Sequence, residues 1–511
     1  MDPSMLALLI EKLKQFLVYE PGKPMVFTDL DFWLFFCVFL IFYSFTYKNR
    51  KTKNAILLIF SLFFYYKSSG WATSLLIYVI TQDFFIAKWI DRSLHQGSKR
   101  TLLSLSVCTN LLLLGYFKYA YLLIDGLNEL FGLAIEKKNW FVEIIPSKDL
   151  LQLDSSSILL PVGISFFIFH SLSYTIDVYR GIVKPLKSWA DYALFVSFFP
   201  ELVAGPIVRA RDFVDQLFLP YHVEKQMFGK GVSLILAGLT KKIILSDIIS
   251  TQLVDRVFDS PQLASGPEAW LAFYGYGLQI FCDFSGYTDI AIGLALVLGF
   301  HLKPNFDQPY KAISITDFWR RWHISLSVWL RDYLYIPLGG NRNGILRTYF
   351  NLLITMLLGG LWHGANIKFL VWGGLHGLAL AIHKLWQTGY GRFSFAIPNP
   401  ISWFLTFHFA LLCWLPFRSD SLESAFLITN KLFLRWNQEL LPEIFNQYKL
   451  SLLILAIGFG IHFLPDFIKN GYTSWFEKIP VWLLAIVVVV SIFIIYQFKA
   501  AESQPFIYFQ F

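Results

Sequence analysis

The sequence is divided into thirteen predominantly apolar runs, and most of them approach the length of a membrane span. A helix needs about 20 apolar residues to cross the hydrocarbon core of a bilayer. Because lipid offers the backbone no hydrogen bonds, runs of this length cross it as helices. The runs lie at residues 31–47, 54–66, 71–90, 101–124, 158–179, 189–207, 229–249, 268–300, 348–365, 367–386, 401–417, 450–468 and 480–498.

The composition excludes a water-soluble fold. Of the 511 residues, 56% are hydrophobic and 15% are charged, whereas soluble domains have roughly 45–50% and 25%. The net charge of +8 could suggest nucleic acid, but the basic residues lie in short loops between apolar runs, as in membrane proteins. We therefore predict an all-α polytopic transmembrane bundle of about 11–13 membrane helices.

Some of these helices are expected to be tilted, broken or re-entrant. The run at 54–66 is short, and the run at 189–207 is interrupted by Pro200, Glu201 and Pro206. Broken helices are tolerated at membrane depth where protein or a water-filled cavity surrounds them.

Lysine and arginine alternate in density along the first loops. Loops 48–53, 91–100 and 180–188 hold 10 in 25 residues, whereas segments 1–30, 67–70 and 125–157 hold 7 in 67. Cytoplasmic loops carry the excess of basic residues. We therefore expect the N-terminus and the 125–157 loop to lie outside, in a multi-pass protein of the cytoplasmic (inner) membrane.

The domain organisation is expected to be simple. Residues 1–511 contain no repeat, low-complexity linker or long polar stretch, so we predict a single transmembrane domain. Residues 1–30 are expected to begin with an interfacial amphipathic helix between Met5 and Tyr19. If a soluble catalytic or carrier domain is needed, another chain must supply it.

Polar residues concentrate between Phe281 and His376, inside otherwise apolar sequence. Ionisable groups at membrane depth are costly and therefore mark functional sites by default. Asp283 and Asp289 form the first such element, among small and hydroxyl residues. The alternative is that they are polar contacts between helices in the bundle interior.

The second element runs from Asp317 to His323 with the sequence DFWRRWH. On one helix, Trp319, Trp322 and His323 would share a face. Arg320 and its neighbouring arginine fit an interfacial anchor equally well. His323 fits that alternative less well, because a neutral imidazole keeps an acceptor nitrogen for a proton.

The third element is GGLWHGAN, residues 359–366. Glycines on both sides of His363 permit the close approach of a backbone or a substrate, Trp362 supplies an apolar wall, and Asn366 follows. With a pKa near about 6.5, a histidine in a dry channel suits proton abstraction from a hydroxyl. Taken alone, such a histidine is more often a packing residue.

These elements resemble the membrane-bound O-acyltransferase (MBOAT) family. The resemblance rests on Trp362-His363-Gly364 with His323 forty residues upstream, and on further segments typical of the bacterial branch that includes the alginate O-acetyltransferase membrane subunit. Those segments are FPELVAGPI (199–207), FSGYTD (284–289), PNF (304–306), RDYLYIPLGG (331–340) and the terminal FQF (509–511). Most of them lie in residues 160–390, which the resemblance makes the catalytic core.

The resemblance implies that His363 is the catalytic base and that His323 is the second active-site histidine. It implies a central funnel or tunnel, for which Asp317, Trp319, Arg320, Trp322, Asp289, Trp362 and Asn366 are lining candidates. No bound cofactor or metal is expected. The acyl donor would be a cytoplasmic thioester, for which we expect acetyl-CoA. The acceptor would be an extracytoplasmic polysaccharide, reached with an SGNH-type acetyltransferase partner.

Other hypotheses remain open at this point. Within the enzyme class they are D-alanyl transfer to teichoic acid and O-acetylation of peptidoglycan. A transporter or flippase would use the same polar path but is expected to contain inverted repeats, which the sequence lacks. A scaffold would leave the glycine-flanked histidine unexplained.

Overall fold

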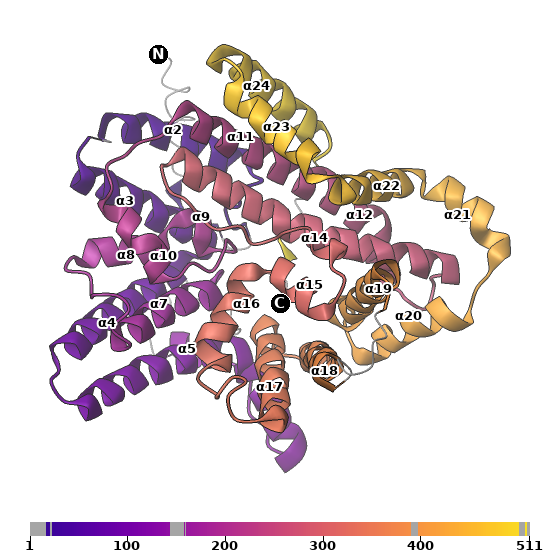
Figure 1. Cartoon of the computed structure of the whole chain (residues 1–511), viewed down its shortest axis with the longest axis horizontal. Coiled ribbons are helices and arrows are strands. Elements are labelled where there is room, and N and C mark those ends of the chain that lie inside the picture. Colours follow the sequence, from indigo (N-terminus) through magenta and orange to yellow (C-terminus); the bar gives the residue numbers. More distant parts are fainter. Residues whose placement is uncertain are drawn as a thin grey trace. The chain divides into compact units, whose positions relative to one another are not determined.

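The computed structural model of the chain is helical throughout its described part (Figure 1). It describes residues 17–20, 23–46, 48–143, 158, 160–389, 397–499 and 506–507. Within these ranges there is no strand, so the predicted all-α class is confirmed. The predicted N-terminal helix lies mostly outside the described residues, and a turn at Phe27 and Thr28 precedes helix α2 (Leu30–Thr46).

Five of the described helical segments are long and apolar enough to cross a membrane. They are Arg50–Arg92, Gln96–Phe131, Gly266–Val297, Ile345–His363 and Asn399–Arg418. A sixth candidate is the pair Gln438–Gln447 and Lys449–Phe463, which is bent by 85°. Together they confirm a multi-pass helical membrane protein.

The chain divides into two compact units, each made of three segments that are not contiguous in the sequence. The first unit comprises residues 1–203, 209–220 and 364–366, and the second comprises 204–208, 221–363 and 367–511. The prediction of a single domain stays a prediction.

The first unit is a helical bundle with a polar centre. Asp83 is fully buried and accepts hydrogen bonds from Ser106 (2.7 Å), Asn110 (2.8 Å) and Ser171 (2.6 Å). These donors come from two neighbouring helices, so the carboxylate links three helices at membrane depth. The helices are α2 (Leu30–Thr46), α3 (Arg50–Ser69), α4 (Thr73–Arg92), α5 (Gln96–Phe131), α6 (Trp140–Glu143), α7 (Ile164–Tyr179), α8 (Trp189–Ser197), α9 (Phe199–Leu202) and α10 (Ala210–Phe213).

The second unit contains both histidines of interest. Its longer helices are α11 (Lys225–Leu239), α14 (Gly266–Val297), α17 (Ile345–His363), α18 (Ile367–Gly389), α19 (Asn399–Arg418), α20 (Leu422–Leu434), α22 (Lys449–Phe463), α23 (Asp466–Lys478) and α24 (Val481–Gln497). Shorter helices are α12 (Asp247–Ile249), α13 (Asp255–Asp259), α15 (Ile315–Arg321), α16 (Ile324–Leu330) and α21 (Leu441–Gln447). Three π-helical turns interrupt the pattern: η3 (Thr240–Ser246), η4 (Ser250–Val254) and η6 (Arg331–Tyr335).

Helices α11 and α14 pack with their backbones nearly touching. A Cβ added to Gly286 would lie 2.8 Å from the carbonyl oxygen of Gly238, and one added to Gly231 would lie 2.9 Å from that of Gly293. Small residues at these positions let two membrane helices approach closely. The glycines therefore set the distance between the two helices.

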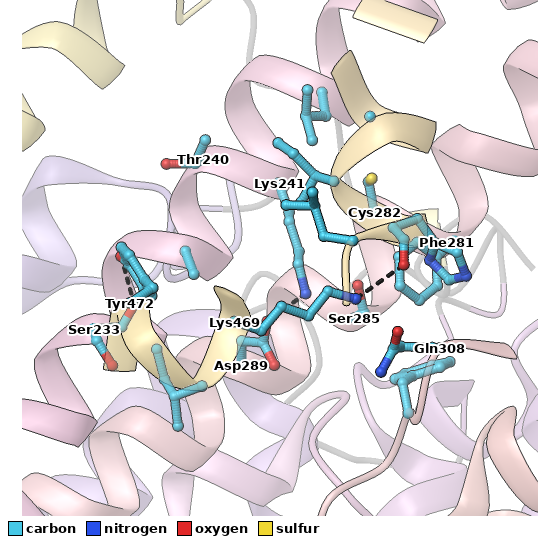
Figure 2. A pocket seen from close by; sticks show the side chains of 18 of the residues that line it. Ser233, Thr240, Lys241, Phe281, Cys282, Ser285, Asp289, Gln308, Lys469 and Tyr472 are labelled. Atoms are coloured by element: carbon cyan, nitrogen blue, oxygen red, sulfur yellow. Dashed lines mark hydrogen bonds and ion pairs between the residues drawn. The ribbon is translucent and has the colours of Figure 1, made fainter. Parts of the chain in front are cut away.

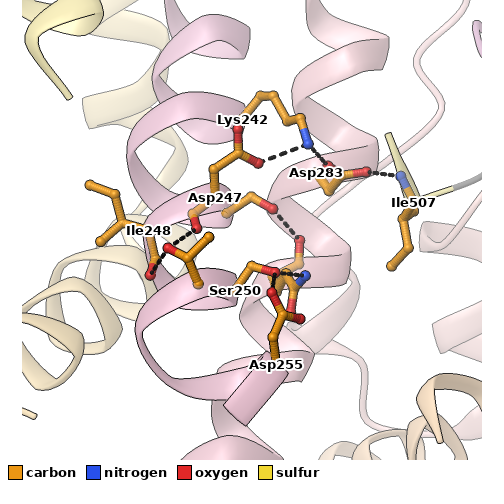
Figure 3. Close-up of polar contacts among 10 residues, drawn as sticks. Lys242, Asp247, Ile248, Ser250, Asp255, Asp283 and Ile507 are labelled. Atoms are coloured by element: carbon orange, nitrogen blue, oxygen red, sulfur yellow. Dashed lines mark hydrogen bonds and ion pairs between the residues drawn. The ribbon is translucent and has the colours of Figure 1, made fainter. Parts of the chain in front are cut away.

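A buried ion-pair cluster joins η3 to α14 (Figure 3). Lys242 Nζ lies 2.6 Å from Asp283 Oδ1 and 2.8 Å from Asp247 Oδ1. The second oxygen of Asp283 accepts the backbone N–H of Ile507 at 3.0 Å. The Lys242 and Asp283 side chains are only 7% and 3% exposed, so each charge depends on its partners.

The predicted interruptions are partly correct. The run at 189–207 is broken, because α8 ends at Ser197 and α9 covers only Phe199–Leu202. The run at 54–66 lies inside the continuous helix α3, so it is not broken, and its tilt stays a prediction. Its polar residues do not interrupt the helix, because buried Asn54 donates to Asp191 Oδ1 (3.3 Å) and to the carbonyl oxygen of Leu217 (3.2 Å).

Candidate active site

His363 ends helix α17 and is enclosed by aromatic rings. Its side chain is 4% exposed. The rings of Trp362 and Trp372 have centroids 5.0 Å from that of the imidazole, and the ring of Phe417 lies at 5.3 Å. All three meet the imidazole edge to face. Such walls keep water from the ring and hold its orientation.

Gly360, three residues before this histidine, serves helix packing. A Cβ on Gly360 would meet the carbonyl oxygen of Phe369 and would lie 3.2 Å from Gly373 Cα. Gly360 therefore lets α18 approach α17, which brings Trp372 of α18 against His363. The sequence predicted the close approach of a backbone or a substrate, and at this glycine the neighbour is a backbone.

His323 lies in a strained turn between α15 and α16. The backbone is extended at Trp322, and His323 has φ +42° and ψ +55°, in the left-handed region. A non-glycine residue there costs on the order of 1–3 kcal/mol, and surrounding contacts must hold it in place. The prediction that Trp319, Trp322 and His323 share one helix face is therefore wrong, because the helix breaks between them.

Trp362 contacts both candidate histidines. Its ring centroid is 5.0 Å from that of His363 and 6.2 Å from that of His323. His323 is fully buried, and it also packs edge-on against Phe284 at 4.6 Å and parallel to Phe306 at 6.5 Å. The structure thus brings the two histidines and Trp362 into one aromatic cluster.

A third histidine extends this cluster. Trp319 Nε1 donates to Nδ1 of the fully buried His376 at 3.3 Å, and Trp372 packs against His376 at 4.8 Å. Trp322, which is also buried, packs against Phe306 at 5.1 Å. The predicted residues Trp319 and Trp322 therefore belong to this cluster, Trp319 through His376 and Trp322 through Phe306.

Three other predicted residues have different surroundings. Asp317 accepts from Arg321 Nε at 3.0 Å and from the backbone N–H of Ile313 at 3.3 Å. Arg320 is exposed on α15. Asn366 lies in the connection 364–366, which belongs to the first unit.

A cavity of about 640 Å³ opens among α11, η3, α14, α22 and α23 (Figure 2). Its polar lining includes the predicted residue Asp289, whose carboxylate pairs with Lys241 Nζ at 2.6 Å. Lys469 of α23 also lines it and donates to the carbonyl oxygen of His462 at 2.9 Å. The volume falls within the range typical of small-molecule sites.

One residue links this cavity to the histidines. Phe306 lines the cavity and packs parallel to the His323 ring at 6.5 Å. His363 is not among the residues that line the cavity. The described ring contacts connect His363 to Phe306 through Trp362 and then His323. The cavity therefore ends one aromatic layer away from His323.

Burial and neighbouring charges shift the acid–base behaviour of two residues outside the candidate spans. Burial lowers the pKa of His323 to about 3, so this imidazole is neutral at physiological pH. Burial, aided by the nearby ammonium groups of Lys311 and Lys241, lowers the pKa of Lys469 to about 8. Lys469 therefore carries its charge at neutral pH but loses it under mildly basic conditions.

Sequence reasoning missed several cavity residues. Lys241, His462 and Lys469 were not singled out, although two of them lie inside predicted apolar runs. The sequence feature that could have identified Lys241 and His462 is an ionisable side chain inside an apolar run. Within the described residues, no group of three or more His, Cys, Asp or Glu side chains could hold a metal ion.

The fold and the site define a class of protein: a multi-pass helical membrane protein with buried histidines in an aromatic cluster beside a charged cavity. Residues 183–419 match the model of the family described as MBOAT, membrane-bound O-acyltransferase. The chain belongs to this family and is an O-acyltransferase. The predicted resemblance is confirmed, as is the enzyme hypothesis over the transporter and the scaffold.

Several relatives cover most of the chain. It is 37% identical to the probable alginate O-acetylase AlgI of Pseudomonas putida over 95% of this chain and 100% of the relative. It is 32% identical to the peptidoglycan O-acetyltransferase of Helicobacter pylori over 99% of this chain and 100% of the relative. The teichoic acid D-alanyltransferase of Bacillus subtilis is more distant, at 27% identity over 48% of this chain and 66% of the relative.

Proposed function

We propose that this protein transfers an acetyl group from a cytoplasmic thioester donor toward the hydroxyl of an extracytoplasmic polysaccharide, in the cytoplasmic membrane. The observation that carries the proposal is that the buried rings of His363 and His323 both contact Trp362. Two near relatives are named as O-acetylating enzymes of polysaccharides, which favours an acetyl group and a glycan acceptor.

In the proposed reaction His363 is the general base. The acceptor hydroxyl oxygen attacks the thioester carbonyl carbon, and His363 takes the hydroxyl proton. A C–O bond forms, the C–S bond breaks, and the thiolate leaves and receives a proton. The aromatic rings around His363 exclude water that would otherwise hydrolyse the thioester.

His323 is proposed to orient or polarise the reacting groups beside His363. Its burial keeps the imidazole neutral, so it can donate from one nitrogen and accept at the other. Asp317 is a second candidate for this role, but its carboxylate accepts a hydrogen bond from Arg321 Nε. We therefore assign the role to His323.

The donor is proposed to occupy the cavity that Phe306 separates from His323. A coenzyme A thioester combines phosphate groups with a long, weakly polar arm. Lys241 and Lys469 supply ammonium groups for the phosphates, and Phe281, Leu245 and further apolar side chains supply a surface for the arm. No cofactor is needed in this scheme, because the donor is a substrate.

The partner is proposed to be an SGNH-type acetyltransferase outside the membrane. The resemblance to the MBOAT family implies such a partner, which would complete the transfer to the glycan outside the membrane. Two acceptors are candidates, alginate and peptidoglycan. Peptidoglycan is a candidate because the match to the Helicobacter enzyme covers nearly the whole chain. D-alanyl transfer to teichoic acid has the weaker support of a half-length match.

Purified membranes incubated with acetyl-labelled coenzyme A test the proposal. Label should pass from the donor to polymer or partner protein in wild-type membranes, and His363→Ala should abolish this transfer at an unchanged amount of protein in the membrane. Undiminished transfer by His363→Ala would remove His363 as the base. Labelling from a D-alanyl carrier protein instead of acetyl-CoA would replace the donor.

A further inference from the structure

Asn305 clamps the strained turn that carries His323. Its side-chain oxygen accepts the backbone N–H of Ser325 at 3.0 Å and the Ser325 hydroxyl at 2.8 Å. Its backbone oxygen accepts the N–H of Ile324 at 2.9 Å. One asparagine therefore fixes the two residues that follow His323, which is how the left-handed backbone at φ +42° is maintained.

The same oxygen sets the proton on the imidazole. Asn305 Oδ1 lies 3.2 Å from His323 Nδ1. Because a backbone N–H donates to Oδ1, that atom is an acceptor, and the hydrogen of the contact must come from Nδ1. The neutral His323 ring is thus the tautomer with its hydrogen on Nδ1 and its lone pair on Nε2.

Stability alone does not account for an amide at this position. Asn305 is 1% exposed, and among the described residues its Nδ2 has no hydrogen-bond partner. A buried donor without a partner is destabilising. The amide oxygen reaches both Ser325 and His323 Nδ1, and the contact with the imidazole is a geometric reason for an uncharged acceptor here.

We propose that Asn305 is a positioning residue of the acyl transfer reaction, holding His323 in one tautomer and one orientation through Oδ1. The proposal rests on the function proposed above, in which His323 acts beside His363. The rings that face His323 are Phe284 of α14, Phe306 of the preceding loop and Trp362 of α17, and none of them titrates. The neutral oxygen of Asn305 therefore leaves the imidazole uncharged.

Two substitutions separate positioning from simple packing. Asn305→Leu removes the acceptor at similar volume and should lower kcat by 10-fold or more, with the KM for the donor unchanged. Asn305→Asp keeps an acceptor for Nδ1 but adds a charge, which raises the pKa of His323. At high pH the Asp variant should keep most of the wild-type kcat. As the pH falls, His323 becomes protonated, so kcat should decrease at a higher pH in this variant than in the wild type.

Asn351 provides matched controls in the same unit. It is fully buried and donates to the carbonyl oxygen of Gly340 at 2.9 Å. Asn351→Leu and Asn351→Asp should lower the unfolding temperature without changing the pH profile of kcat. If Asn305→Leu does not fold, the pH profile of Asn305→Asp decides the matter.

The results also separate this proposal from the proposed function. A fully active His323→Gln variant would overturn the role of His323 and the clamp together. If His323→Gln is inactive while Asn305→Leu retains at least the kcat of Asn351→Leu, only the role of Asn305 fails. A wild-type pH profile in Asn305→Asp would likewise overturn the positioning role.

Discussion

The close contact between α11 and α14 predicts that one added methyl group at their interface destabilises the protein. In Gly286→Ala the new Cβ would lie 2.8 Å from the Gly238 carbonyl oxygen, 0.6 Å inside the 3.4 Å at which ordinary contact begins, and 3.2 Å from Lys241 Cβ. The obstacle is backbone, so the helices must separate. Overpacking of this kind costs about 1–3 kcal/mol.

Gly460→Ala in α22 is the matched control. This glycine is also helical and is exposed, and its added Cβ would meet nothing within 4 Å. Both variants gain the intrinsic helix preference of alanine, about 1 kcal/mol. The difference between them therefore isolates the steric term.

The measurement is the free energy of unfolding in detergent, followed by tryptophan fluorescence. We expect Gly286→Ala to be about 1–3 kcal/mol less stable than Gly460→Ala. The separation should also loosen the pairs that Lys241 and Lys242 make with α14 and reduce acyl transfer. Equal stability of the two variants would show that the helices are not in backbone contact.

Three further predictions concern the charged and aromatic groups. Lys242→Met leaves two buried carboxylates without their cation and should destabilise the protein by about 3–5 kcal/mol; adding Asp283→Asn should restore part of this loss in the same unfolding assay, and no recovery would refute the pairing. The KM for an anionic donor should be constant below about pH 7 and rise as Lys469 deprotonates near its pKa of about 8, whereas Lys469→Gln should have a high KM at every pH. Between pH 8 and 10.5 the Lys469 amine is protonated in the unfolded chain but largely neutral in the folded protein, because its folded pKa is about 8 instead of 10.5. The free energy of unfolding should therefore rise with pH across this range. Identical stability profiles for wild type and Lys469→Gln would contradict this. Trp372→Leu should leave a space beside His363, lower stability by about 2–4 kcal/mol and reduce kcat more than KM, and an unchanged kcat would show that the ring does not orient the imidazole.

Most helices were predictable because their length and apolar character are local properties. The run at 268–300 corresponds to α14 (Gly266–Val297), and the run at 480–498 to α24 (Val481–Gln497). The break in the run at 189–207 was also predictable, because proline has no N–H and disfavours the helical conformation in the residue before it. The unbroken helix α3 was not, because contacts with distant residues satisfy its polar groups.

The arrangement of the site depended on contacts that the sequence does not display. The helical spacing of Trp319, Trp322 and His323 was overridden by Asn305, an acceptor outside that segment. Asp289 was recognised as an unusual charge, but its partner Lys241 lies 48 residues earlier and is brought to it by the α11–α14 contact. His363 and its motif were found because glycine, tryptophan and histidine are adjacent in the chain.

The pairing of Lys241 and Lys242 with the carboxylates of α14 also bears on how the chain enters the membrane. A single aspartate at the centre of a helix raises the cost of insertion by the translocon by roughly 2.5–3.5 kcal/mol, and α14 carries two. Their lysine partners lie in η3, which the ribosome completes before α14, so the counter-charges are already made when α14 emerges. We therefore expect the η3 lysines and α14 to enter the membrane together, which lowers the cost of inserting the two aspartates.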